Sequence, residues 1–238
     1  MPDQPGDRSP AVALDAAWTS TVTAAWSSTL TAAGATAPAA ELAAAGADLL
    51  RRWGQPHRRY HDLEHLAEVL SAVDLLARHT VDQPAVRLAA WFHDAVYDGS
   101  PGQDEEASAV LAERVLGRLG LPVGRTAAVG RLVRMTAAHS PDPSDPDAAV
   151  LSDADLAVLA AAPARYRRYR LAVRAEYAHL TDQQFRSGRE AVLRRIAGRR
   201  PIFSTSTGVA RWEGAARANL AAELALLAGS GHGVPDQR

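Results

Sequence analysis

The sequence predicts an all-α protein that folds as one domain of about ten helices. Alanine- and leucine-rich segments carry apolar residues at helical spacing, and glycine or proline separates them roughly every 15–25 residues. Few stretches alternate polar and apolar residues with a period of two, so no β-sheet is expected. With 238 residues, the chain is long enough to bury a sizeable core.

The expected helices differ in how they should be buried. The third carries an apolar stripe from Leu66 to Leu76, whereas the segment 89–96 of the fourth is apolar all round apart from His93 and Asp94 and should lie inside the protein. The segment 140–147 (SPDPSDPD) holds three prolines and is expected to be a loop. The helices are expected at 11–33, 37–53, 62–79, 84–97, 104–119, 123–139, 152–162, 164–179, 182–198 and 210–228.

The two ends of the chain differ in composition from the rest. Residues 1–10 and 229–238 are rich in proline, glycine and polar side chains, so we expect flexible tails around a single domain at 11–228. No secretory h-region opens the sequence, and no apolar run approaches the length of a membrane span. The expected location is cytoplasmic, with no membrane partner.

Composition excludes several classes of chemistry. The chain has no cysteine, which rules out disulfides, thiolate metal sites and a thiol nucleophile. All 26 basic residues are arginine, so a P-loop lysine and a Schiff-base mechanism are also ruled out. Charges nearly cancel, with a formal net charge of -1, and no global field indicates nucleic acid as a partner.

A polar pair interrupts the apolar segment AAWFHDAVYD at residues 89–98. His93 and Asp94 lie side by side where the surrounding residues predict burial. Burying an ionised carboxylate is costly unless it is paired or bound to a metal. The pair therefore needs a partner elsewhere in the fold.

The histidine cluster HRRYHDLEH offers the first partner. His57, His61 and His65 are spaced by four residues, which predicts one face of a helix. Each of them alone is more readily interpreted as a side chain that caps or solvates a helix start. His65, however, lies beside the apolar stripe and can point inward, so we predict that it meets the buried pair.

The segment LSDADLAVL offers a carboxylate. Asp153 and Asp155 would lie in the first turn of a helix capped by Ser152, where acids are favoured by the macrodipole alone. Because two residues i and i+2 point about 200° apart on a helix, only one of them should face inward. Asp155 shares its side with Leu159, so we predict that Asp155 faces the core and that Asp153 faces outward or contacts the site through water.

These residues together predict a site for one divalent metal ion. Nitrogen and oxygen ligands without sulfur suit Mn, Fe, Co, Ni, Zn or Mg. Four protein ligands leave coordination positions open for water and substrate, which is typical of catalytic sites. The predicted ligands are His65, His93, Asp94 and Asp155.

The order H…HD…D on helices resembles the HD superfamily of metal-dependent phosphohydrolases. YHDLEHLAEVL, AAWFHDAVYD, DEEASA, LSDADLAVL, YRLAVRAEY and ARANLAAEL together resemble one predicted family of that superfamily, over residues 50–225. The resemblance implies an HD-domain-like helical bundle, phosphohydrolase chemistry and the same four ligands. Members with two metals carry two further histidines between the doublet and the last aspartate. Here only His139 lies there, so one metal is expected.

Other polar residues are candidates for catalysis. Asp94 is also a candidate to orient the attacking water. His61 would protonate the leaving group or hydrogen-bond a metal-bound water. His139 would contact the substrate or a metal ligand. Glu105 would act as a general base or, as a plainer alternative, cap the helix that begins beside Asp104.

Arginines are the candidates for binding a phosphate group. Residues 165–217 hold thirteen arginines and four acidic residues, and Arg174 shares a predicted helix face with Arg167 and Arg170. Arg174 and Arg58 are the predicted substrate contacts. In a chain without lysine, arginine also fills solvated helix faces, which is the plainer interpretation. Glu213, Arg217 and Asn219 either pack along a helix or brace the site.

The leading hypothesis is a metal-dependent phosphohydrolase that cleaves an ester or anhydride of a small phosphorylated substrate, with nucleotides included. An iron-dependent HD-type oxygenase is the first alternative, since an N/O-ligated iron with open positions also activates oxygen. A non-catalytic module that binds a metal or nucleotide is the second. The sequence leaves the oligomeric state open, a homo-oligomer included.

Overall fold

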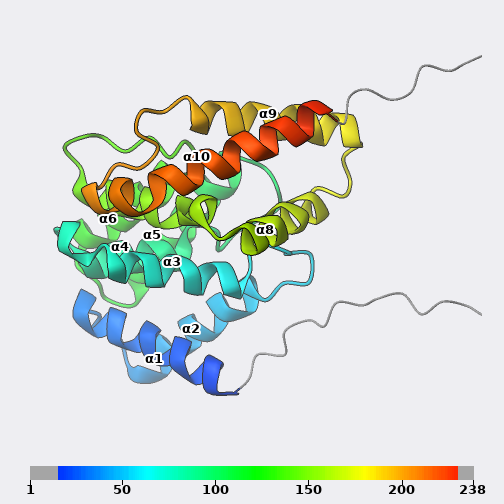
Figure 1. The fold of residues 1–238 in the computed structure, drawn as a ribbon. Coiled ribbons are helices and arrows are strands. Elements are labelled where there is room, and N and C mark those ends of the chain that lie inside the picture. The colour runs from blue at the N-terminus through cyan, green and yellow to red at the C-terminus, as the bar shows by residue number, and fades with distance from the viewer. Residues whose placement is uncertain (1–15, 230–238) are drawn as a thin grey trace, which may run out of the picture.

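The structure, a computed structural model, describes residues 16–229 (Figure 1). These residues form ten α-helices and two short 3₁₀ helices, and this range contains no β-strand, so the predicted all-α fold class is confirmed. The predicted tails lie outside the described residues, except for Gly229, which ends the last helix. None of the helices in the described part is both long enough and apolar enough to cross a membrane.

The helices largely follow the predicted segments. Their bounds are α1 Ala16–Ala33, α2 Ala39–Trp53, α3 Leu63–Leu75, η1 Ala77–His79, α4 Gln83–Phe92, α5 Gln103–Arg118, α6 Val123–Thr136, α7 Pro146–Asp155, η2 Leu156–Ala160, α8 Pro163–Glu176, α9 Asp182–Ala197 and α10 Ser206–Gly229.

The predicted helix at 152–162 is wrong in its boundaries. Helix α7 begins at Pro146, because Asp145 caps it by accepting a backbone N–H of the first turn at 3.1 Å. Proline suits the first helical position, where no N–H donor is needed. Asp153 and Asp155 therefore lie in the last turn of α7, and the helix dipole does not explain them.

The start of α3 also differs from the prediction. The Asp62 carboxylate accepts the backbone N–H groups of Glu64 and His65, at 2.9 and 3.2 Å, so the helix begins at Leu63. His57 and His61 precede the helix in a connecting segment. The prediction that three histidines share one helical face is therefore wrong, and only His65 lies on α3.

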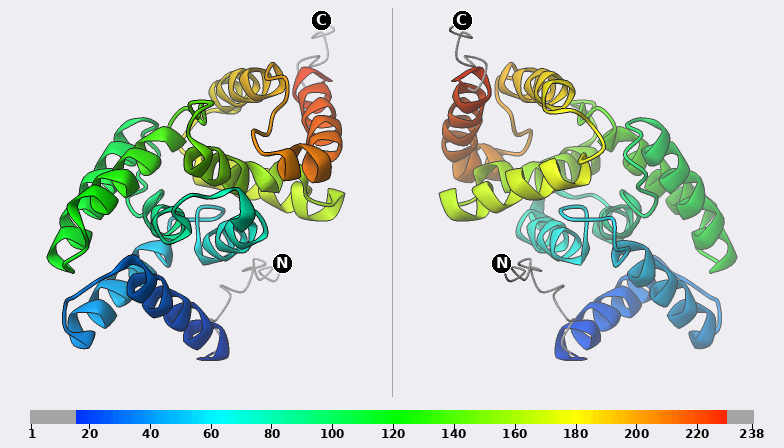
Figure 2. Two further views of the ribbon diagram at one scale, coloured as in Figure 1. Left: turned by 90° about the vertical axis from the view of Figure 1, so that its left-hand side faces the viewer. Right: turned by 90° about the vertical axis from the view of Figure 1, so that its right-hand side faces the viewer.

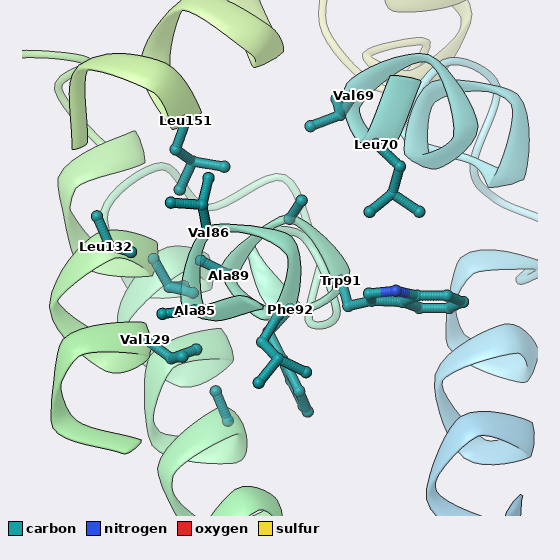
Figure 3. Packing of buried hydrophobic residues seen from close by; sticks show 14 of the residues in the cluster. Val69, Leu70, Ala85, Val86, Ala89, Trp91, Phe92, Val129, Leu132 and Leu151 are labelled. Carbon is teal, nitrogen blue, oxygen red and sulfur yellow. The ribbon is translucent and has the colours of Figure 1, made fainter. Parts of the chain in front are cut away.

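Helix α4 forms the centre of the larger hydrophobic core. Seven of its ten residues are buried, and it contacts α1, α3, α5, α6 and α7. The all-round apolar pattern therefore predicted burial correctly, although the helix ends at Phe92 and the chain turns at His93. Figure 3 shows the side chains around it: Val69 and Leu70 from α3, Val129 and Leu132 from α6, and Leu151 from α7.

A second apolar cluster joins α8, α9, α10 and η2. These three α-helices gather at one end of the protein, and α1 and α2 occupy the opposite end (Figure 2). Glu223 is buried in this cluster, where it accepts hydrogen bonds from the Tyr166 hydroxyl at 2.6 Å and the Arg189 guanidinium at 2.8 Å. Trp212 packs against both clusters and links them.

Replacing Gly46 by alanine is expected to destabilise the packing of α1 on α2. A Cβ at Gly46 would lie 2.6 Å from Cδ1 of Trp26. The Trp26 ring cannot easily move, because it is 1% exposed and its Nε1 donates to the Leu42 carbonyl at 2.8 Å. Overpacking of this kind costs about 1–3 kcal/mol of unfolding free energy, which urea titration would measure.

The matched control is Gly188→Ala in α9. Nothing lies within 4 Å of a Cβ at Gly188, so this exposed helical position should gain about 0.5–1 kcal/mol from the better helix propensity of alanine. Equal unfolding free energies for the two variants would contradict the packing argument.

Candidate metal centre

Four side chains from three separate helix ends converge in the interior. His65 lies in the first turn of α3, His93 and Asp94 follow α4 directly, and Asp155 ends α7. The Nε2 atoms of His65 and His93 are 3.2 Å apart, and Oδ1 of Asp155 lies 3.1 and 3.6 Å from them. Oδ2 of Asp94 lies 3.2 Å from Nε2 of His93 and 3.8 Å from Nε2 of His65.

The ligand atoms of His65, His93 and Asp155 all lie within 4.8 Å of one another, a spacing at which they could hold a metal ion, and Asp94 lies beside the two imidazoles. Ligand bonds of about 2.0–2.2 Å place neighbouring ligand atoms about 3.0–3.5 Å apart in octahedral or tetrahedral geometry, close to the separations observed. Nδ1 of His93 lies 2.8 Å from the Ala90 carbonyl, to which it donates. Because the hydrogen of the neutral ring is on Nδ1, Nε2 has a free lone pair, which points toward the other ligands. Such an arrangement of acceptors needs a cation or protons between them.

The carboxylates and imidazoles of the cluster shift one another's pKa values. Burial lowers the pKa of His93, but Asp94 and Asp155 outweigh this effect and raise it to about 9. Burial raises the pKa values of both carboxyl groups, yet the neighbouring imidazoles, His93 above all, hold them well below their usual range. The buried carboxylates therefore favour positive charge at this point, whether it comes from protons or from a metal ion.

His139 contacts the second carboxylate oxygen of Asp155. Its Nε2 lies 3.3 Å from Oδ2 of Asp155, so the two oxygens of this carboxylate face different histidines. His139 has a left-handed φ of 48°, which is uncommon for a residue with a side chain. Burial lowers its pKa, and Arg199 and His93 add to that effect.

A cavity opens next to the four converging side chains. Its volume is about 130 Å³, and no arginine is among the described residues that line it. His61, His139, Asp94 and Asp155 face it together with aromatic and acidic residues from the following connection. The remaining lining residues are Tyr97, Gly99, Pro101, Asp104, Glu105, Thr136 and Tyr177.

His61 reaches the cavity although it lies outside α3. Its Nδ1 is 2.7 Å from Oε2 of Glu176, and its ring stacks on Tyr97 with a centroid distance of 4.2 Å. Burial lowers the pKa of His61, but the hydrogen bond to Glu176 and the charge of Asp94 raise it above its usual value.

The structure gives the Glu105 carboxylate a capping contact. Gly102, which has a positive φ of 85°, precedes α5, and its N–H donates to Oε2 of Glu105 at 2.5 Å. Glu105 thus caps α5, as the plainer interpretation predicted, and it also lines the cavity.

The two predicted substrate-binding arginines have other partners. Arg58 is buried, and its Nη1 donates to the backbone carbonyls of His61 and Asp94 at 2.9 and 2.8 Å. Arg174 donates to the Tyr177 carbonyl at 2.8 Å and pairs with Asp182 at 2.7 Å. Neither arginine lines the cavity, so the structure gives both of them roles in holding the chain.

The helix periodicity predicted that Asp153 faces outward, but the structure shows that it does not. Its side chain is fully buried on the other side of α7, where it accepts the N–H groups of Ser204 and Thr205, both at 2.7 Å. It also accepts the Thr205 hydroxyl at 2.8 Å. The expectation was wrong because residues 204–205 and the first turn of α10 pack against this side of α7. Gly208 permits the approach, since a Cβ there would lie 2.5 Å from Asp153.

Several residues near the centre were not predicted to have a role. Glu176 is the most prominent, and its segment YRLAVRAEY gave no sign that this one carboxylate would be buried. Arg195 and Arg199 donate to the Ala138 carbonyl at 3.2 and 2.6 Å and so hold the segment that carries His139. Only their sequence position in the arginine-rich third could have indicated them.

Residues of α10 brace the neighbouring connections, not the ligands themselves. Asn219 donates to the carbonyls of Leu159 and Ala161 at 2.8 and 2.9 Å, and so ties α10 to η2 just after Asp155. Glu213 accepts the Ile202 N–H at 3.0 Å and pairs with Arg217 at 2.6 Å.

Comparison of the chain with protein-family models, with curated proteins and with solved structures gives no match.

Proposed function

We propose that the protein is a hydrolase of the HD type that cleaves a phosphate ester or anhydride and would hold one divalent metal ion with His65, His93, Asp94 and Asp155. The observation that carries the proposal is the convergence of His65, His93, Asp94 and Asp155, of which the two aspartates line a cavity. Their order along the chain resembles the H…HD…D pattern of that superfamily. Open coordination positions beside a cavity are typical of a catalytic metal site.

The residues at the cavity suit hydrolysis of a phosphoryl group. A divalent ion, when bound, supplies a Lewis acid for the phosphoryl oxygen and for a water molecule. Asp94 lines the cavity and can accept a proton from the attacking water. His61 offers a proton to the leaving oxygen, and His139 offers a hydrogen bond to the phosphoryl group. A single metal agrees with the one histidine between Asp94 and Asp155.

The cavity supports a small phosphate monoester as the substrate. Its volume of about 130 Å³ is well below the roughly 300–1,000 Å³ of sites for drug-sized ligands. Polyphosphate chains are usually bound by arginine or lysine, and no arginine within residues 16–229 lines this cavity. Asp104 and Glu105 add negative charge to its wall, which disfavours a nucleoside triphosphate.

The cytoplasmic location and the oligomeric state stay predictions from the sequence.

Asp94→Ala is expected to abolish stoichiometric metal binding, because it removes a ligand from a buried anionic site. Elemental analysis after purification without added metal, and again after loading with Mn²⁺, would measure metal per chain. A bound metal at one hundred times its Kd stabilises a protein by about 2.7 kcal/mol, so chelation should lower the melting temperature of the wild type. It should leave that of Asp94→Ala unchanged.

Asp98→Ala is the control, since Asp98 is exposed in the same turn and does not line the cavity. Full metal occupancy in Asp94→Ala would contradict the site. Phosphate release from a panel of monoesters by the loaded wild type tests the reaction. Two irons per chain after anoxic purification, with no phosphate release, would favour an oxygenase.

A further inference from the structure

Glu176 is a buried carboxylate that accepts hydrogen bonds from three successive residues of the segment around His61 and from Tyr97. It is the last residue of α8, and its side chain is 2% exposed. Its Oε1 accepts three successive backbone N–H groups, those of Arg59, Tyr60 and His61, at 2.8, 2.8 and 2.9 Å. Three such bonds fix the path of a connection that has no helical hydrogen bonds of its own at these positions.

The other oxygen of Glu176 holds the His61 ring. Oε2 lies 2.7 Å from Nδ1 of His61 and accepts the Tyr97 hydroxyl at 3.0 Å. Tyr97 in turn stacks on the imidazole with an interplanar angle of 27°. Because a carboxylate only accepts, Nδ1 carries the hydrogen of this bond. The nitrogen that remains for the cavity is therefore Nε2.

We propose that Glu176 is a positioning residue that holds His61 so that Nε2 of the ring donates a proton to the leaving oxygen of the substrate. This inference depends on the proposed phosphohydrolase function. Glu176 itself does not line the cavity, so it acts only through His61.

Every proton and electron pair of the proposed step is accounted for. The water oxygen forms a bond to phosphorus while the bond from phosphorus to the leaving oxygen breaks, and the electron pair of that bond stays on the leaving oxygen. His61 enters the step as the imidazolium, with hydrogens on both ring nitrogens. Its Nε2 proton converts this oxygen to an alcohol and leaves the neutral ring with its hydrogen on Nδ1. The proton lost by the water passes to the Asp94 carboxylate, and exchange with solvent restores both side chains.

The test compares two esters that differ in their need for a proton. The p-nitrophenolate of p-nitrophenyl phosphate leaves without protonation, whereas the alkoxide of ethyl phosphate does not. General acid catalysis contributes about 10²–10⁴-fold, so Glu176→Gln should lose at least about 100-fold in kcat on ethyl phosphate. On p-nitrophenyl phosphate it should lose only a few-fold. His61→Ala should show the same selectivity, and the double variant should lose no more than either single variant.

Glu223→Gln is the matched control. Glu223 is also a buried carboxylate that accepts a tyrosine hydroxyl, but it lies in the second apolar cluster, away from the cavity. It should change kcat equally for the two esters. Equal losses on both esters in Glu176→Gln would overturn the proposal, because they would indicate a role in stability alone.

A second measurement does not depend on activity. In the metal-free wild type at alkaline pH, where imidazoles are neutral, ¹⁵N NMR should show His61 with its hydrogen on Nδ1, and Glu176→Gln should mix the two tautomers. A wild-type ring with its hydrogen on Nε2 would overturn the proposal, and this spectrum requires no variant to fold. If the loaded wild type hydrolyses neither ester, the proposed function fails, and the spectrum alone then decides whether Glu176 positions His61.

Discussion

Asp155→Asn is expected to lower metal affinity and activity by orders of magnitude. Oδ1 of Asp155 lies 3.1 Å from Nε2 of His65 and 3.6 Å from Nε2 of His93, at the point where the ligand atoms converge. An amide in this place removes one negative charge and offers a neutral ligand oxygen at best. Its NH₂ group would face either the two imidazoles or His139, which lies 3.3 Å from the second oxygen.

Asp153→Asn is the matched variant, two residues away on the same helix. Asp153 is fully buried, but its hydrogen bonds go to Ser204 and Thr205 at the start of α10. An amide can accept one of these N–H groups but not all three donors. A buried donor left unsatisfied costs about 1–3 kcal/mol, so we expect lower unfolding free energy with full metal occupancy in the folded protein.

Two measurements separate these variants. Isothermal titration with Mn²⁺ would give the metal affinity of each, and urea titration of the metal-free proteins would give the unfolding free energy. Asp155→Asn should change mainly the first quantity, and Asp153→Asn mainly the second. Loss of metal affinity in Asp153→Asn, with affinity retained in Asp155→Asn, would reverse the assignment of the two aspartates.

The fold class was predictable because helical spacing is a local property of the sequence. The apolar residues from Ala85 to Phe92 cover every side of one helix, and a helix of that kind has to be buried. Helix ends were less predictable, because competing caps decide them. Ser152 and Asp145 are both good N-cap residues, and only the structure shows that the second one begins α7.

The convergence of His65, His93, Asp94 and Asp155 was suggested by residue type in apolar surroundings. The direction of Asp153 was not predictable in the same way. Periodicity places it correctly on the side of α7 opposite to Asp155, but it cannot say that residues 204–205 and the first turn of α10 pack against that side. Burial of both sides of a helix depends on contacts between residues that are far apart in sequence.

Glu176 shows the same limit more clearly. Its hydrogen-bond partners at residues 59–61 lie more than a hundred positions earlier in the chain. Within α8 it is one acidic residue among many arginines, and its local pattern is that of a solvated helix end. His61 was a candidate to protonate the leaving group or to hydrogen-bond a metal-bound water, and it lines the cavity although it lies outside the helix that its spacing from His65 predicted.

Arg58→Ala is expected to disrupt the contact between the segment of His61, the candidate proton donor, and the segment of Asp94, a candidate metal ligand. Arg58 is 4% exposed, and its guanidinium lies 5.4 Å from the ring centroids of both Trp53 and Tyr97. One nitrogen, Nη1, joins the backbone carbonyls of His61 and Asp94. Alanine would leave both carbonyls without this donor and would empty the space between the two rings.

The cost of Arg58→Ala should be about 3 kcal/mol or more, since each unsatisfied buried acceptor costs about 1–3 kcal/mol and the lost side chain adds a cavity. Arg59→Ala is the control on the neighbouring residue. The Arg59 side chain is exposed, and only its backbone N–H contacts Glu176, so the change should stay within about 0.5 kcal/mol.

Urea titration of the two metal-free variants measures this difference, and Mn²⁺ titration of the folded fraction measures its effect on the metal centre. We expect Arg58→Ala to weaken Mn²⁺ binding, because it releases the backbone of Asp94, and Arg59→Ala to bind as the wild type does. If Arg58→Ala keeps wild-type stability and metal affinity but raises KM for a phosphate ester, the buried position of this guanidinium is wrong. Its charge would then act on the substrate, as the sequence first suggested.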